Sequence, residues 1–409
     1  MKNNSYKLGF LCEITSSKRI FYKEYQTFGV PFYRSKEIIE LYNHANIDTE
    51  LFISKERYDE IKSKFGVPVK EDILLTSVGT IGIPYLVKQS DRFYFKDGNL
   101  TWFRKYKRNL VDPSYLFLWI KSNPGRQILK ILSLGAAQPA LTISKLKNIS
   151  ISLPPLASQQ RIAGILSAYD DLIENNNKRI RLLEQMAENL YKEWFVRFRF
   201  PGHEHTPMHN GIPSGWKRVN LFDLAEVVYG YAFKSNRFCN DSSLTPVVRI
   251  RDILDNHTET FTDETCEDKY LIKKNAILVG MDGIFHMCLW NGERAFLNQR
   301  VVMLNSKEDT ISNYFLFLAI RPQIKYWEQV ISGTTVAHLG DKHLKKIKVL
   351  IPSKELLNKA NKIITEAMDE SNLLLNKNRL LAKQRDLLLP RLMIGKLEVD
   401  SRIKESPKT

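Results

Sequence analysis

The sequence predicts an α+β protein in which two similar mixed α/β domains alternate with two long helices. Three observations lead to this prediction. The chain of 409 residues is longer than one ordinary hydrophobic core organises. Its two halves repeat the same order of sequence blocks. Each half also ends in a long stretch whose apolar residues recur at the three-four spacing of an amphipathic helix.

The internal repeat is clearest in a glycine-led block that precedes each long helix. The block "GAAQPALTISKLKNISISLP" from Gly135 aligns without a gap on "GTTVAHLGDKHLKKIKVLIP" from Gly333. Earlier in each half, "EDILLTSVGTIG" from Glu71 resembles "KNAILVGMDGIF" from Lys274. Short β-branched and aromatic runs between turn residues surround these blocks and are typical of strands. We expect a pseudo-two-fold repeat divided into domain 1 (1–155), helix 1 (156–198), a linker (199–212), domain 2 (213–352), helix 2 (353–396) and a tail (397–409).

The two long helices are predicted to form an antiparallel coiled coil. Helix 1 has apolar seam residues such as Ile162, Leu166 and Ile173, with a polar interruption at Asn176. Helix 2 has a weaker seam that includes Leu374. Because helix 1 leads from domain 1 to domain 2, and helix 2 bears the same relation to its own domain, the second must run back along the first. A helix of about 40 residues is about 60 Å long, so the pair is expected to act as a spacer.

The helices carry more apolar side chains than a two-helix seam uses, which indicates a further contact surface. Packing against the globular domains is the alternative use of these side chains, and the two uses can share the surface. We expect a partner protein at Leu182, Met186, Leu190, Trp194, Phe195, Leu381, Leu388 and Leu392.

The composition indicates a globular protein with a polyanionic partner. The formal net charge is +16 and the pI is about 9.4, which makes nucleic acid the leading candidate. No apolar run is long enough to span a bilayer, and the N-terminus lacks the apolar core of a signal peptide, so a cytoplasmic location without a membrane partner is expected. The cysteines are scattered and the histidines lack ligand spacing, so no disulfide framework or metal site is expected.

No motif in the chain predicts catalysis. Asp112-Pro113-Ser114-Tyr115 looks like the turn with which amino-methyltransferases hold a target amine, but the second half lacks its proline and acid. A helix N-cap with proline at the first helical position explains it better. There is no phosphate-binding P-loop and no glycine-rich loop for S-adenosylmethionine. We therefore expect neither a catalytic residue nor a cofactor or metal bound by this chain.

Candidate DNA contacts come from basic and polar residues in the repeated blocks. "TWFRKYKRNL" interleaves Arg104 and Lys105 with aromatic residues, as expected for phosphate contacts, although an ordinary edge strand would look similar. The glycine-led blocks differ between their matched anchors, as expected if they read different bases on a common scaffold, with simple drift as the alternative. The full set of candidates is Arg34, Lys36, Ser77, Thr80, Arg104, Lys105, Gln138, Lys145, Arg249, Arg251, Asp282, His286, Arg300, Thr334, Thr335, His338 and Lys342.

The order of elements and several motifs resemble the DNA-specificity (S) subunits of type I restriction-modification systems. The resemblance covers nearly the whole chain. It is carried by "LPPLASQQRIAGILSAYDDLIENNNKRIRLLEQMAENLYKEWFVRF" from Leu153, by "LLLPRLMIGKLEV" at the end of helix 2, and by "EDILLTSVGTIG". Helix 2 departs from the pattern, since it begins "IPSKELLNKANKII".

The resemblance implies a non-catalytic subunit with two target-recognition domains, each reading one half of a split, asymmetric site on double-stranded DNA. The helices would set the spacing and dock two modification subunits, which bind S-adenosylmethionine and methylate adenine N6. Two restriction subunits, which use ATP and Mg²⁺, would complete the restricting complex. The alternatives are a stand-alone, dimer-like DNA-binding regulator and a part of a fused modification-cleavage enzyme.

Overall fold

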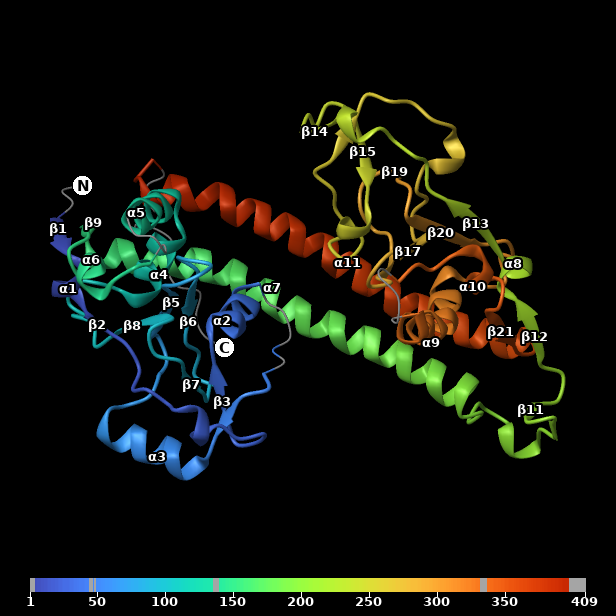
Figure 1. Cartoon of the computed structure of the whole chain (residues 1–409), viewed down its shortest axis with the longest axis horizontal. Coiled ribbons are helices and arrows are strands. Elements are labelled where there is room, and N and C mark those ends of the chain that lie inside the picture. The colour runs from blue at the N-terminus through green and yellow to red at the C-terminus, as the bar shows by residue number, and fades with distance from the viewer. Residues whose placement is uncertain (1–3, 44–46, 48, 135–139, 332–336, 397–409) are drawn as a thin grey trace. The chain divides into compact units, whose positions relative to one another are not determined.

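The computed structural model describes residues 4–43, 47, 49–134, 140–331 and 337–396. The chain divides into two compact units: unit 1 joins Met1–Asn175 to Asn378–Thr409, and unit 2 is Asn176–Lys377. Each unit holds one α/β domain and a portion of each long helix, α7 (Leu156–Tyr191) and α11 (Lys354–Met393). The α+β fold class predicted from the sequence is confirmed (Figure 1).

Domain 1, the part of unit 1 that precedes α7, is built on an antiparallel sheet with strand order β2-β8-β5-β6. A smaller sheet has the order β4-β3-β7, with β3 and β7 parallel. The first and last strands of the domain, β1 and β9, pair with each other. The strands are β1 (Asn4–Lys7), β2 (Glu13–Thr15), β3 (Val30–Tyr33), β4 (Phe52–Ile53), β5 (Ile73–Thr76), β6 (Pro84–Leu86), β7 (Tyr94–Phe95), β8 (Leu100–Arg104) and β9 (Ser150–Leu153).

Short helices surround these sheets. They are α1 (Leu8–Leu11), η1 (Tyr22–Glu24), α2 (Ser35–Tyr42), α3 (Lys55–Lys64), α4 (Pro113–Lys121), α5 (Asn123–Ser133) and α6 (Ile143–Lys147). Helix α4 begins as the sequence predicts: the Asp112 carboxylate accepts a hydrogen bond of 2.9 Å from the amide of Tyr115, and Pro113 occupies the first turn. The aspartate-proline motif is therefore a helix cap.

Domain 2, in unit 2, repeats this arrangement. Its main sheet has the order β13-β20-β17-β18, its smaller sheet the order β14-β16-β15-β19 with β15 and β19 parallel, and β12 pairs with β21. The strands are β12 (Lys217–Asn220), β13 (Ala225–Tyr229), β14 (Phe238–Cys239), β15 (Thr245–Val248), β16 (Phe261–Thr262), β17 (Ile277–Gly280), β18 (Met287–Leu289), β19 (Phe296–Leu297), β20 (Val301–Ser306) and β21 (Lys348–Ile351).

The segments around domain 2 differ from those around domain 1. The segment after α7 contains a π-helical turn (Lys192–Val196), η3 (His203–His205) and the hairpin β10 (Met208–His209) to β11 (Ile212–Pro213). The helices of domain 2 are α8 (Leu221–Leu224), η4 (Ser235–Arg237), η5 (Ile250–Asp252), η6 (Asp268–Tyr270), α9 (Asn313–Ile331) and α10 (Asp341–Leu344). No described helix stands between β16 and β17 with the length of α3; only the short turn η6 lies there.

Strand register makes the internal repeat exact at the level of single residues. Ile73 pairs with Phe103 in domain 1, and Ile277 pairs with Leu304 in domain 2. In this register Glu71 of domain 1 and Asn275 of domain 2 occupy equivalent positions. Both residues have a positive φ, 73° and 59°. The repeat predicted from the sequence is thus present in the backbone.

The long helices run antiparallel within each unit. In unit 1 the start of α7, with Ile162 and Leu166, shares a buried cluster with Leu392 near the end of α11. In unit 2 the end of α7, with Tyr191, shares a cluster with Leu356 near the start of α11. Each cluster also contains the core of its own domain, so each domain packs onto the helix pair of its unit.

Candidate nucleic-acid interface

The two domains build the same backbone bridge beside their glycine-led blocks. In domain 1 Val78 bridges Ala140, and in domain 2 Asp282 bridges His338. The amide of Leu339 donates to the carbonyl of Met281 at 2.7 Å, as the amide of Leu141 does to Ser77 at 2.9 Å. The backbone scaffold is therefore shared at this position, whereas the side chains on it differ between the two domains.

In domain 2 the structure brings three of the predicted DNA-contact residues together. His338 Nδ1 lies 2.6 Å from Asp282 Oδ1, and Arg300 Nε lies 3.5 Å from Asp282 Oδ2. The side chains of Arg300 and His338 are 58% and 45% exposed. Carboxylate, guanidinium and imidazole groups are suited to the donor and acceptor edges of base pairs. These residues form the most compact group of predicted contacts in domain 2.

Of the corresponding residues predicted in domain 1, two form hydrogen bonds within the domain that limit their contact with DNA. Ser77 is buried, and its hydroxyl lies 2.6 Å from the hydroxyl of Thr101 and donates to the carbonyl of Leu75 at 3.2 Å. Thr80 is exposed in the β5–β6 turn. The ammonium of Lys145 donates to the carbonyl of Leu132 at 2.8 Å. The hydroxyl of Ser77 therefore serves the core of the sheet in this conformation.

The remaining predicted contacts fall into several environments. His286 is half-buried beside β18, Lys342 is exposed on α10, and Lys36 pairs with Glu40 at 3.7 Å. Arg251 is exposed and lies 3.7 Å from Asp252. Gln138, Thr334 and Thr335 lie outside the described residues.

Arg34 and Arg249 occupy equivalent positions and cap the turns that follow β3 and β15. The amide of Arg34 donates to Glu37 Oε2 at 2.7 Å, and its guanidinium donates to Glu37 Oε1 at 2.8 Å. The amide of Arg249 donates to Asp252 Oδ2 at 2.9 Å in the same way. Because the Glu37 side chain is fully buried, Arg34 neutralises a buried carboxylate, a structural role that sequence patterning alone did not predict.

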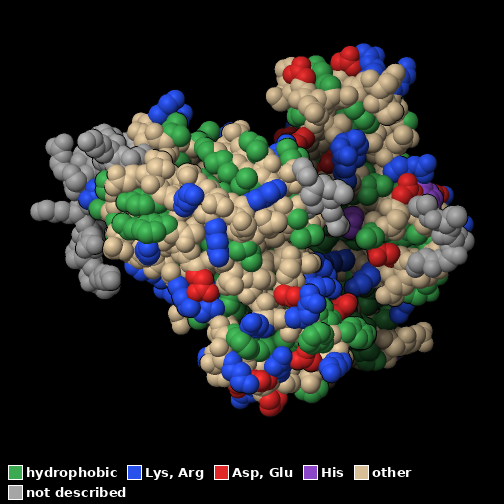
Figure 2. Space-filling view, turned by 60° about the vertical axis from the view of Figure 1, so that its left-hand side comes forward, with side chains coloured by type: hydrophobic (Ala, Val, Ile, Leu, Met, Phe, Trp, Pro, Cys, Tyr) green, Lys and Arg blue, Asp and Glu red, His purple; other side chains and the backbone are tan. Residues whose placement is uncertain are grey.

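Arg104 and Lys105 line a groove of about 480 Å³ at the end of β8. We call this groove the basic furrow; its charged residues are Lys62, Lys70, Asp72, Arg104, Lys105 and Arg108. Arg104 and Lys105 are among the DNA contacts predicted from the sequence, whereas Lys62 and Lys70, which come from α3 and the loop after it, are not. Figure 2 shows lysine and arginine side chains spread over the face in view among acidic and hydrophobic ones, so the local geometry, and not the net charge, identifies the furrow.

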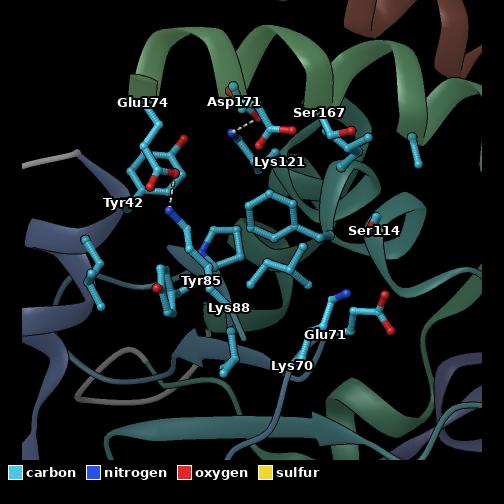
Figure 3. Close-up of a pocket in the computed structure, with 18 of the residues that line it drawn as sticks. Tyr42, Lys70, Glu71, Tyr85, Lys88, Ser114, Lys121, Ser167, Asp171 and Glu174 are labelled. Carbon is cyan, nitrogen blue, oxygen red and sulfur yellow. Dashed lines mark hydrogen bonds and ion pairs between the residues drawn. The ribbon is translucent and has the colours of Figure 1, made fainter. Parts of the chain in front are cut away.

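A second cavity of domain 1, shown in Figure 3, lies against α7. Lys88 pairs with Glu174 of α7, and the ammonium of Lys121 lies 4.0 Å from Asp170. Burial lowers the pKa of Lys121 from its ordinary value, and the carboxylate of Asp170 partly opposes that shift. The charged pairs therefore fasten domain 1 to α7.

Domain 2 contacts its long helix at the equivalent place through an asparagine in place of a lysine. Leu86 and Leu289 occupy matching register positions, so Asn291 takes the position of Lys88. The side-chain amide of Asn291 donates to the carbonyl of Asn372 on α11 at 3.2 Å. The amide of Asn372 in turn donates to the hydroxyl of Tyr314 at 2.8 Å. The Tyr314 hydroxyl donates to the Asp369 carboxylate on α11 at 2.6 Å, so domain 2 contacts its helix through hydrogen bonds where domain 1 uses lysine-carboxylate pairs.

The predicted partner-contact residues on the helices divide by exposure. Leu182 and Met186 are 65% and 46% exposed. Phe195 and Leu392 are buried in the cores of their own units, at 3% and 6%. The half-buried members of the set are Leu190, Trp194, Leu381 and Leu388. Further exposed leucines on α11 are Leu373, Leu380 and Leu387; Leu373 and Leu387 are among the apolar residues that the sequence places off the helix seam.

The described residues contain no group of three or more His, Cys, Asp or Glu side chains able to hold a metal ion. Burial raises the pKa of the Cys12 and Cys288 thiols to about 12, which makes both thiols poor nucleophiles at neutral pH. None of the helices formed by the described residues is long and apolar enough to span a membrane.

Comparison with known proteins identifies the family. The profile described as "Type I restriction modification DNA specificity domain" matches residues 2–185 and 213–383. The chain is similar to the type I restriction enzyme MjaIX specificity subunit of Methanocaldococcus jannaschii, with 26% identity over 350 residues that cover 81% of this chain and 78% of that protein. It is also similar to the type I restriction enzyme EcoBI specificity subunit of Escherichia coli, with 33% identity over 158 residues, 39% of this chain and 32% of that protein.

The fold is likewise similar to the crystal structure of the type I restriction-modification system S subunit from M. genitalium. The TM-score is 0.61 at 17% identity, and 95% of this chain and 96% of that chain are covered. The chain belongs to the family of type I restriction-modification specificity subunits. Members of this family are non-catalytic, and the catalytic activities lie in partner subunits.

Proposed function

We propose that each domain reads one half of a bipartite, asymmetric site on double-stranded DNA. The observation that carries this proposal is the shared bridge beside the glycine-led blocks, which presents Val78 and Ala140 in domain 1 but Asp282 and His338 in domain 2. Duplicated scaffolds bind two related positions on a duplex, and different side chains on them select different bases. The site read by the whole chain is therefore asymmetric.

The long helices set the spacing between the half-sites and dock two modification subunits. This part of the proposal is supported by the exposed apolar side chains of α7 and α11, among them Leu182, Met186 and Leu387. The modification subunits supply S-adenosylmethionine and methylate adenine N6, which requires the base to leave the duplex. Two restriction subunits with ATP and Mg²⁺ complete the restricting complex. The chain itself binds no cofactor and acts in the cytoplasm.

Sequencing of methylated adenines in cells that express the chain with a modification subunit tests this function. The expected result is one split motif with two fixed half-sequences and a constant gap. When residues 1–150 are exchanged for those of another family member, one half-sequence changes and the other stays the same. Methylation at a single undivided motif, or a change in both half-sequences, contradicts the proposal.

Co-purification separates this function from that of a stand-alone DNA-binding regulator. A specificity subunit retains its modification subunits through gel filtration, and Leu182→Asp with Met186→Asp weakens that complex because charge is placed on an exposed apolar surface. Lys178→Glu with Arg181→Glu, on the same stretch of α7, is the control for added negative charge. Tight binding of one compact site by the chain alone, without co-purification, favours the regulator.

A further inference from the structure

The basic furrow of domain 1 has a charge that its own surroundings leave uncompensated. The one carboxylate that lines it, Asp72, is 4% exposed and accepts hydrogen bonds from Trp102 Nε1 at 2.8 Å and from the amide of Val69 at 3.0 Å. Among the described residues, Lys62 and Lys70 form no ion pair. The furrow therefore presents a local excess of positive charge at the surface.

The guanidinium of Arg104 is held in place at the edge of the furrow. It stacks on the ring of Trp102, 4.0 Å from the centroid, and donates to the carbonyl of Phe65 at 3.1 Å. Gly66 has a φ of 82°, and a Cβ at that position would lie 2.9 Å from Arg104 Nη2. A planar guanidinium fixed by stacking loses little freedom when it binds a phosphate. The Arg104 guanidinium is thus preorganised to donate hydrogen bonds to a phosphate.

The other two cations of the furrow are paired only at the surface. Lys105 lies 2.8 Å from Glu13, and its side chain is 66% exposed. Arg108 lies 2.6 Å from Glu71, and its side chain is 60% exposed. Exposed pairs of this kind contribute little to stability, about 0–1 kcal/mol. Both cations can therefore exchange a carboxylate for a phosphate at low cost.

Domain 2 repeats this furrow only in part: in the register that matches Glu71 to Asn275, the exposed Lys274 takes the position of Lys70. The strand register that matches Phe103 to Leu304 places Asn305 and Ser306 at the positions of Arg104 and Lys105. The segment between β16 and β17, where domain 1 has α3, contains the acids Asp263, Glu264, Glu267 and Asp268 and the lysines Lys269, Lys273 and Lys274. Lys269 pairs with Glu267 and Lys273 pairs with Glu226. At this edge of the sheet, the cations Arg104 and Lys105 of domain 1 are thus replaced by the uncharged Asn305 and Ser306 in domain 2.

We propose that the basic furrow is a DNA-phosphate clamp confined to domain 1. Domain 1 then contributes most of the salt-dependent part of the binding affinity for duplex DNA, and domain 2 contributes little of it. This inference rests on the proposed function, because it assumes that the chain binds DNA. The ligand is the phosphodiester backbone, since lysine and arginine side chains in a groove neutralise phosphates without reading bases. The clamp extends the contact of domain 1 beyond the bases that it reads.

The salt dependence of binding tests the clamp. The full-length chain is titrated with a duplex of mixed sequence over a series of KCl concentrations, and the slope of log K against log salt is compared between variants. The test variant is Lys62→Ala with Lys70→Ala. The matched control, Lys217→Ala with Lys234→Ala, also loses two exposed lysines, but in domain 2.

The clamp variant is expected to reduce the slope by about 2, since each neutralised phosphate contributes about 0.9 to it. The control is expected to keep the wild-type slope. Equal changes in the two variants, or an unchanged slope in the clamp variant, overturn the clamp while the proposed function stands. Failure of the wild-type chain, alone and with a modification subunit, to bind duplex DNA overturns the proposed function itself.

Methylated-adenine sequencing supplies the second readout. Because phosphate contacts carry no base information, the clamp variant is expected to keep both half-sequences while the extent of methylation falls. A changed half-sequence in the clamp variant shows that the furrow reads bases and overturns the clamp. Thermal unfolding of the variant is expected to match the wild type, since both lysine side chains are exposed.

Discussion

Replacement of Asp170 in unit 1 is expected to lower the free energy of unfolding by a measurable amount. Its carboxylate pairs with the guanidinium of Arg385 on α11 and lies 4.0 Å from the ammonium of Lys121 on α4. The side chains of Lys121, Arg385 and Asp170 are 13%, 16% and 23% exposed. One carboxylate therefore joins two helices and a domain in a partly desolvated site. The Asp170→Asn variant leaves two cations there without their shared counter-charge.

The loss in free energy of unfolding caused by Asp170→Asn follows from these distances and exposed fractions. Unit charges 4 Å apart attract by about 4 kcal/mol at an effective dielectric of about 20. Breaking a buried pair costs about 3–5 kcal/mol because the remaining charge is left uncompensated. Arg385 keeps a contact of 2.9 Å to the exposed Asp386, which places Asp170→Asn near the lower end, at about 3 kcal/mol. For a unit of this size that corresponds to a fall in melting temperature of about 6–12 °C.

Differential scanning calorimetry of the full-length chain measures this cost, with a double-mutant cycle between Asp170→Asn and Arg385→Gln. Glu355→Gln is the control, because Glu355 pairs with Lys359 on the surface of α11, where the side chains are 80% and 58% exposed. The control is expected to change stability by less than about 0.5 kcal/mol. A coupling energy below about 0.5 kcal/mol, or equal costs for Asp170→Asn and Glu355→Gln, would refute this reasoning.

The pH dependence of Asp170→Asn provides an independent check. The folded-state pKa of Lys121 lies below its unfolded value of about 10.4. Between these two values the unfolded chain holds more protons, so stability rises with pH. Loss of Asp170 lowers the folded pKa of Lys121 further and extends this window downward. The destabilisation caused by Asp170→Asn should therefore shrink as the pH is raised toward the unfolded pKa of Lys121, about 10.4. A destabilisation that grows as the pH rises contradicts the assignment.

Three further outcomes are expected. Leu166→Ala, at a fully buried position between α7 and domain 1, should destabilise unit 1 by about 2–5 kcal/mol in denaturant unfolding, and a cost below about 1 kcal/mol would show that the helix does not seal this core. Cys12 and Cys288 should resist iodoacetamide at about pH 8 until the chain unfolds, because burial raises their pKa to about 12; rapid labelling of the folded chain speaks against their burial. Asp282→Asn should alter base preference in one half-sequence by about 1–3 kcal/mol, seen by methylated-adenine sequencing, and an unchanged motif removes Asp282 from the reading surface.

The sequence by itself determined the duplication, the long helices and the family. These features depend on patterns that survive without tertiary information: the ordered recurrence of blocks, the three-four spacing of apolar residues, and local caps such as that of Asp112 on Tyr115. Net charge likewise needs no fold, and it pointed to a polyanionic partner.

Only the tertiary structure decided which polar residues face solvent and which serve the core. Ser77 lies in a repeated block, but its hydroxyl is hydrogen-bonded to the hydroxyl of the buried Thr101. Arg34 neutralises the buried carboxylate of Glu37. Lys62 and Lys70 join Arg104 because the chain returns from α3 to the end of β8. Such groupings arise between segments far apart in sequence, where no local periodicity records them, and hydrogen-bond and ion-pair partners are fixed only when those segments pack.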